Sequence, residues 1–247
     1  MKFFYDNFTE SQVCGMFTVG HYISIVVFFL ALTLLILYSK NFSIEKNKKI
    51  RFIIAICICA TEVIKITLRL IKREHVDAWI PVYYCSLFLF AVWFTFIKYE
   101  IVNKMGYAFI TMGGVMASIL FVFYPSTSLA IKPIWHPGSI HSFLYHLTMC
   151  YVGLMALITK EYTPKAKDGL WYFIFVFSAC IIGYIINQIV PANCMFLSNA
   201  YKLPILDDIL KKSHITYMLI VSFAQSLLMY YANYGIYKLT IKIRERN

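Results

Sequence analysis

A thiol and an imidazole, the two groups of a Cys/His catalytic pair, lie at matching depths in two apolar runs of the sequence. Cys85 follows Pro81 by four residues near the start of one run, and His146 lies about one and a half turns into another. An imidazole can take the thiol proton, and the thiolate then attacks a carbonyl carbon to form an acyl-thioester. A thiol one turn inside a helix also lies near the positive end of the helix dipole, which favours the thiolate. We therefore predict Cys85 as the nucleophile and His146 as the base.

Four more polar side chains are expected near the same end of the helices, namely His21, Glu62, Asn187 and Asn193. Polar groups inside a membrane protein are costly and normally face the interior of the bundle. Glu62 is predicted to lie deeper and to orient the imidazole, as the third group of a triad does. Structural alternatives stay open for these residues. Glu62 can pair with Lys65 on the same helix face, and the asparagines can bond between helices or cap a helix end.

The walls of the predicted site are mainly aromatic, and the site is expected to open sideways to lipid. The residues predicted to line it are Tyr83, Tyr84, Phe88, Tyr145 and His141. No two histidines have the i, i+4 spacing of a helical metal site, and the sequence has no phosphate loop, dinucleotide fingerprint or serine-hydrolase elbow. We therefore expect no metal and no other cofactor. Most of the seven cysteines are expected to be small buried residues, with a disulfide between Cys14 and Cys194 left open.

Long apolar segments must position these side chains. Of the 247 residues, 60% are hydrophobic, against about 45–50% in a soluble domain, and the mean hydropathy is +0.68. A run of about 20 apolar residues is long enough to cross the hydrocarbon core of a bilayer. The sequence therefore predicts an all-α, polytopic bundle in one transmembrane domain, residues 1–247, with seven helices at about 21–38, 52–71, 80–97, 105–123, 140–159, 170–190 and 214–237.

The net charge of +11 is expected to set topology rather than to bind nucleic acid. Lys and Arg gather in the loops between the apolar runs, and the loops on one side of the predicted bundle hold about twice as many as those on the other. Basic loops stay on the cytoplasmic side. The N-terminus is therefore predicted to lie outside and the C-terminus in the cytoplasm. The composition, rich in Lys, Ile, Asn, Phe and Tyr, suggests a bacterial plasma membrane.

Around the candidate site the sequence looks like the YwaF-like family of integral membrane proteins, over about residues 15–235. His21 and Glu62 fall where that family tends to place a His and a Glu. The segments that carry the resemblance are Ile80-Pro81-Val82-Tyr83-Tyr84-Cys85, Phe143-Leu144-Tyr145-His146, and Asn193-Cys194-Met195-Phe196-Leu197 followed by Pro204. The sequence departs from the family at Tyr83, Tyr84 and Cys194, where the family usually has His, Leu and Tyr.

The YwaF-like family resembles membrane acyltransferases that remodel phospholipids with a Cys/His pair. The resemblance implies that Cys85 carries an acyl chain as a thioester and that His146 is the base. The implied partners are membrane phospholipids or other acylated lipids, with the oligomeric state left open. The competing hypothesis is a small-molecule or lipid transporter without covalent chemistry, in which Glu62 and the asparagines line a path across the membrane. A transporter needs access from both faces, whereas an acyltransferase needs a site open to one leaflet.

Overall fold

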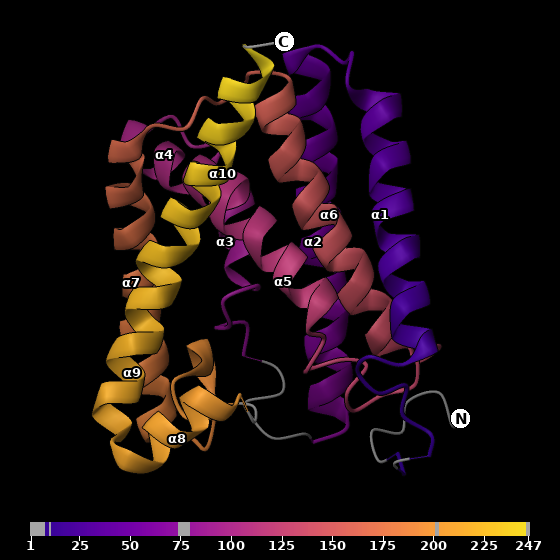
Figure 1. Ribbon diagram of the computed structural model, residues 1–247, viewed down its shortest axis with the longest axis vertical. Coiled ribbons are helices and arrows are strands. Elements are labelled where there is room, and N and C mark those ends of the chain that lie inside the picture. The colour runs from indigo at the N-terminus through magenta and orange to yellow at the C-terminus, as the bar shows by residue number, and fades with distance from the viewer. Residues whose placement is uncertain (1–7, 10, 74–79, 201–202, 246–247) are drawn as a thin grey trace.

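The computed structural model describes residues 8–9, 11–73, 80–200 and 203–245, and within them all regular structure is helical (Figure 1). The α-helices are α1 (Val19–Ser39), α2 (Ile44–Ile71), α3 (Leu87–Phe94), α4 (Glu100–Ala108), α5 (Val115–Phe123), α6 (Pro137–Ile158), α7 (Gly169–Ile189), α8 (Pro204–Lys212), α9 (His214–Phe223) and α10 (Met229–Arg244). Two π-helical turns, Phe109–Gly114 and Ala224–Leu228, join α4 to α5 and α9 to α10. Two short 3₁₀ turns, Ala166–Asp168 and Cys194–Phe196, complete the order.

Among the residues that the structure describes, five helical segments are long and apolar enough to cross a membrane: Val19–Ser39, Glu100–Phe123, Pro137–Ile158, Ala166–Ile189 and His214–Arg244. The chain is therefore a multi-pass membrane protein. Two of the seven predicted spans are not among these five. Helix α2 is long enough but carries Glu62, Lys65 and Arg69 in its second half, and α3 has only 8 residues. Seven passes and the orientation of the bundle thus remain predictions.

The helices form a bundle whose interior is crossed by the broken segment α4–α5 (Figure 1). Helices α1, α2 and α6 lie on one side of it, and α7, α9 and α10 lie on the other. The described ends of the chain lie at opposite ends of the bundle. Helix α1 has few buried residues, among them Phe28 and Leu32, and exposes most of its apolar side chains. Such a helix suits contact with lipid, since lipid tails are as apolar as the side chains themselves.

Several helix boundaries differ from the predicted ones because polar residues extend the helices beyond the apolar runs. Helix α2 begins at Ile44, well before the predicted residue 52, because the Ser43 hydroxyl caps it by accepting from the Lys46 amide. The His136 side chain likewise caps α6 by accepting from the Gly138 amide, with Pro137 in the first helical position. The predicted loop 192–213 also contains the amphipathic helix α8.

The predicted helix 80–97 requires the largest correction. Only Leu87–Phe94 is helical, and residues 80–86 form an irregular segment and a turn. Cys85 therefore lies just before the helix, not one turn inside it. Backbone without helical bonds is tolerated at membrane depth where other protein groups satisfy it. Here the carbonyl of Val82 accepts from the amide of Met195 at 3.0 Å, so a distant loop supplies the missing bond.

The π-helical turn Phe109–Gly114 lies in the centre of the bundle, and its backbone is bonded by a neighbouring helix. The side-chain amide of Asn233 in α10 donates to the carbonyls of Thr111 and Met112 at 3.2 and 2.9 Å. Gly113 leaves room for two tyrosines, because a Cβ at this position would lie 2.6 Å from both the Tyr84 hydroxyl and a ring carbon of Tyr172. The turn thus lets α7 and the segment before α3 approach closely.

A buried ionic network holds together the end of the bundle where α2 begins. The Arg51 guanidinium binds both carboxylate oxygens of Glu161, at 2.6 and 2.8 Å, and also donates to Thr95 and Tyr107. The carboxylate accepts two further bonds, from Tyr107 and Asn47. Both charged side chains are almost fully buried. The network ties α2 to α4 and to the segment after α6.

Candidate functional site

The Cys85 thiol and the His146 imidazole face each other. The Cys85 sulfur lies 3.2 Å from Nε2 of His146, which is hydrogen-bonding distance for sulfur. The other ring nitrogen, Nδ1, lies 2.7 Å from the Ser142 carbonyl oxygen. A carbonyl oxygen can only accept, so Nδ1 carries the proton of the neutral ring and donates a hydrogen bond to the Ser142 carbonyl. The lone pair of Nε2 then points at the sulfur, which is the arrangement required of a base for the thiol.

The imidazole is held between aromatic rings from α5 and α6. The Phe121 ring is parallel to it, with centroids 3.7 Å apart and planes 5° apart. The Tyr145 ring meets it edge-on, with centroids 5.8 Å apart. His146 is 6% exposed. With Nδ1 bonded to its own helix and one face covered, the ring has little freedom to rotate away from Cys85.

The backbone around Cys85 is fixed by tyrosines. The Tyr145 hydroxyl donates to the Cys85 carbonyl at 3.1 Å, and the Tyr145 ring packs edge-on against Phe88. The neighbouring Tyr84 is buried, and its hydroxyl is bonded to the Tyr172 hydroxyl, which in turn donates to the Gln225 carbonyl in the second π-helical turn. Three of the residues predicted to line the site thus act on the segment that carries the thiol.

The segment 193–197 forms a tight loop that supports the Cys85 segment from the other side. Met195 and Phe196 have positive φ values of 51° and 58°, a conformation that non-glycine residues rarely adopt. The loop is held by bonds on both sides of Met195, whose amide donates to Val82 and whose carbonyl accepts from the Gln225 side chain at 2.8 Å. The Phe196 ring packs against that of Tyr83, with centroids 6.0 Å apart. The strained loop therefore positions residues 82 and 83.

The two predicted asparagines stabilise this loop. Asn187 exchanges two bonds with the backbone of Cys194, at 2.9 and 3.1 Å. The side-chain oxygen of Asn193 accepts hydrogen bonds from the backbone amides of Ser198 and Asn199. Its side-chain nitrogen donates to the backbone carbonyl of Asn199. Both asparagines close the loop, which differs from the bonding between helices and the helix capping that were left open from the sequence.

His21 is fully buried, but its hydrogen bonds go to Phe17 and Val122 and not to Cys85 or His146. Its Nδ1 accepts from the Phe17 amide and its Nε2 donates to the Val122 carbonyl, both at 2.9 Å. Because Val122 is adjacent to Phe121, His21 fixes the position of the ring that covers His146. His21 therefore acts on the Cys85–His146 pair indirectly, through α5.

Glu62 forms an ion pair with Lys65 at 2.6 Å, the structural alternative left open from the sequence. The Ser142 carbonyl makes the orienting bond to the imidazole that was predicted for Glu62. His141 lies one turn before Tyr145 with ring centroids 6.1 Å apart, so it borders the site through that tyrosine.

Cys14 and Cys194 are free thiols in the structure. Within the described ranges, no cluster of three or more His, Cys, Asp or Glu residues is arranged to hold a metal ion. The contacts that the sequence did not predict are Phe121 on His146 and the Tyr84–Tyr172–Gln225 chain. A phenylalanine within an apolar helix gives no signal for the first, and the second depends on π-helical turns that have no marker in the sequence.

The sequence model of one protein family, the TMEM164 family, matches residues 16–234. Neither a curated protein nor a solved structure matches the chain. The matched range includes every residue of the candidate site described above.

Proposed function

The chain belongs to the TMEM164 family, and we propose that it is an integral membrane acyltransferase that carries an acyl chain on Cys85. The observation that supports this proposal is the contact between the Cys85 sulfur and Nε2 of His146, with Nδ1 bonded to Ser142. The resemblance of the Cys85, His146 and Asn193 segments to YwaF-like proteins points to the same chemistry.

The proposed reaction has two halves. In the first, Nε2 of His146 takes the Cys85 proton while the sulfur attacks the ester carbonyl of a phospholipid donor. The sulfur–acyl bond forms, the ester C–O bond breaks, and the leaving alcohol receives the proton from Nε2. In the second, the hydroxyl of an acceptor lipid gives its proton to Nε2 and attacks the thioester. The sulfur leaves and recovers the proton, which restores the enzyme. Separated charges would be costly in a buried site, so proton transfer accompanies each attack.

The surroundings of the dyad suit a lipid substrate. The aromatic rings of Phe88, Phe121 and Tyr145 surround the thiol and the imidazole. Cys85 itself is half-buried, and on the other side of α6 the apolar side chains of Ile140 and Leu144 are 49% and 56% exposed. Because exposed apolar side chains on a membrane helix contact lipid and the thiol is not fully enclosed, we expect a donor to approach sideways from the bilayer.

Transport is the weaker alternative. A transporter needs a polar path through the bundle, but the residues packed inward from the dyad are apolar and fully buried, among them Phe88, Val92, Phe109 and Met112. The ionic groups at the opposite end, Arg51 and Glu161, are bonded to each other instead of facing a channel. This packing favours a site that opens to one leaflet.

The direct test is to look for the acyl-enzyme. Purified protein is incubated with mixed phospholipids and digested, and the Cys85 peptide is examined by mass spectrometry. The proposal expects a mass increase equal to one acyl group, removed by hydroxylamine. A Cys85 peptide that stays unmodified while the lipids are remodelled would overturn the thioester mechanism.

Variants separate chemistry from folding. Cys85→Ser is nearly isosteric and should lose most transfer activity while keeping its melting temperature. His146→Ala should lose a comparable amount, and the double variant no more than either, because residues that act as a unit are not additive. Cys57→Ser, at an exposed thiol, is the matched control and should keep full activity. Full activity in Cys85→Ser would contradict the proposal.

A further inference from the structure

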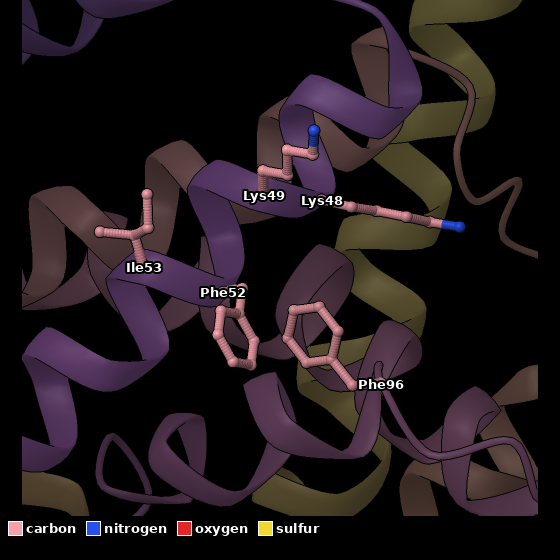
Figure 2. Close-up of a pocket in the computed structure, with 5 residues that line it drawn as sticks. All are labelled: Lys48, Lys49, Phe52, Ile53 and Phe96. Atoms are coloured by element: carbon pink, nitrogen blue, oxygen red, sulfur yellow. The ribbon is translucent and has the colours of Figure 1, made fainter.

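A shallow groove of about 380 Å³ lies on the outside of the bundle, where α2 begins. Figure 2 shows the five residues that line it, Lys48, Lys49, Phe52, Ile53 and Phe96. Four come from the first half of α2, and Phe96 comes from the segment that follows α3. No residue of the Cys85–His146 site takes part.

The end of the groove nearer the start of α2 is cationic, since it carries Lys48 and Lys49. Lys48 and Lys49 are exposed, and neither forms an ion pair with a carboxylate in the part of the chain that the structure describes. Other lysines do form such pairs, namely Lys65, Lys104 and Lys211. Glu161 is close enough for Lys48 to act on it electrostatically, but its oxygens are already bonded to Arg51, Tyr107 and Asn47. The two ammonium groups remain available to an external anion.

The end of the groove further along α2 is apolar. The rings of Phe52 and Phe96 meet edge to face with centroids 5.6 Å apart, and Phe52 and Ile53 are 43% and 59% exposed. Phe52 follows Lys48 by four residues, and Ile53 follows Lys49 by four, so each apolar side chain lies on the same helix face as a lysine. At about 1.5 Å per residue, the backbone of each apolar residue lies roughly 6 Å further along α2 than that of its lysine.

We propose that this groove binds an anionic glycerophospholipid. The headgroup phosphate accepts hydrogen bonds from Lys48 and Lys49, and an acyl chain lies over Phe52, Ile53 and Phe96. The order along the helix, cations first and apolar rings one turn deeper, matches the order of phosphate and hydrocarbon in a bilayer. Lysines at a membrane surface favour anionic lipids over zwitterionic ones, and the apolar surface below them distinguishes a lipid from a free phosphate.

The test measures lipid retention. The purified protein in detergent is incubated with dioleoyl phosphatidylglycerol or with dioleoyl phosphatidylcholine, and the lipids that stay bound are counted by native mass spectrometry. The wild type should retain phosphatidylglycerol more strongly. Lys48→Gln/Lys49→Gln should lower the affinity for phosphatidylglycerol by about fivefold for each lysine removed, and Phe52→Ala should weaken it further. Lys48→Arg/Lys49→Arg keeps both charges and should keep the affinity.

A matched control removes the same charge from the same end of the bundle. Lys40 and Lys160 are exposed and do not line the groove, so Lys40→Gln/Lys160→Gln should bind phosphatidylglycerol like the wild type. An excess of inorganic phosphate should not displace the lipid. Equal retention of both lipids, equal losses in the two double variants, or complete displacement by phosphate would each overturn the proposal.

Discussion

The imidazole of His146 lies flat on the ring of Phe121, with centroids 3.7 Å apart and planes 5° apart. The contact joins two helices, since Phe121 belongs to α5 and His146 to α6. His21 holds the adjacent backbone by bonding to the Val122 carbonyl. The direction in which Nε2 points at Cys85 thus depends on packing as well as on the bond from Nδ1.

The first prediction removes this flat surface. Phe121→Leu keeps an apolar side chain but lets the imidazole rotate, so acyl transfer should slow by up to about 100-fold, the usual cost of misplacing a reacting group by about 1 Å. The rate at which the Cys85 peptide becomes acylated measures this. Phe121→Tyr keeps the ring and should stay close to the wild-type rate. An unchanged rate in Phe121→Leu would show that the stacked ring does not position the base.

The second prediction concerns the buried pair of Arg51 and Glu161. Glu161→Gln leaves the guanidinium buried without its counter-charge, and breaking a buried pair in this way costs about 3–5 kcal/mol. The melting temperature in detergent should fall sharply. Asp207→Asn breaks the exposed pair with Lys211 and should leave the melting temperature almost unchanged, because solvent screens an exposed pair. Equal shifts in the two variants would contradict the central role of the buried network.

The third prediction is the pH dependence of the same pair. Burial raises the pKa of Glu161, but the hydrogen bonds and charge of Arg51 outweigh burial and hold this pKa below its usual range. A carboxyl with a depressed folded-state pKa adds stability above its unfolded pKa of about 4.3 and loses it as the pH falls through the folded value. The difference in melting temperature between wild type and Glu161→Gln should therefore shrink as the pH is lowered from 7 to 3. A difference that stays constant would disprove the linkage.

The fourth prediction compares two glycines. Gly113→Ala would place a methyl group 2.6 Å from Tyr84 and Tyr172, so the tyrosine pair must shift. Overpacking of this kind costs about 1–3 kcal/mol, and because Tyr84 is adjacent to Cys85, transfer activity should fall too. Gly235→Ala is the control, because nothing lies within 4 Å of its Cβ, and it should be neutral or stabilising by about 1 kcal/mol. Wild-type stability and activity in Gly113→Ala would contradict the close approach.

The fifth prediction tests the orientation of the bundle. Phe8→Cys should react with an impermeant maleimide in intact cells, and Glu245→Cys should react only after the cells are opened. The unsubstituted protein gives the background from its native thiols. Labelling of Glu245→Cys alone in intact cells would reverse the topology inferred from the basic loops.

Much of the architecture follows from the sequence because apolar runs of membrane length leave few alternatives. The spans at α1, α6 and α7 begin and end within a few residues of the predicted positions. The approach of Cys85 to His146 was also predictable, since both were placed at a similar depth near the same membrane surface. Both inferences used only the positions of residues along the apolar runs.

The parts that the sequence did not predict depend on such contacts. Residues 80–86 are mostly apolar, and their irregular backbone is bonded by distant residues, since Met195 donates to Val82 and Tyr145 donates to Cys85. Glu62 was expected to orient the imidazole, but Lys65 lies within ion-pair reach on its own helix and a backbone carbonyl performs the orienting role. Arg51 falls just outside the predicted helix 52–71, and its buried pairing could not be predicted because its partner Glu161 lies far away in the sequence.

The bond between Val82 and Met195 also has a consequence for biogenesis. The ribosome synthesises Cys85 and His146 well before Met195, so the segment that carries the thiol lacks its support while the later helices are still being made. The loop 193–197 must fold between α7 and α9 before the backbone of residues 82 and 83 is fixed. A nascent chain halted before this point would carry both the thiol and the imidazole without the bond that holds Val82. The order of synthesis thus leaves residues 82 and 83 as the last part of the site to gain their backbone support.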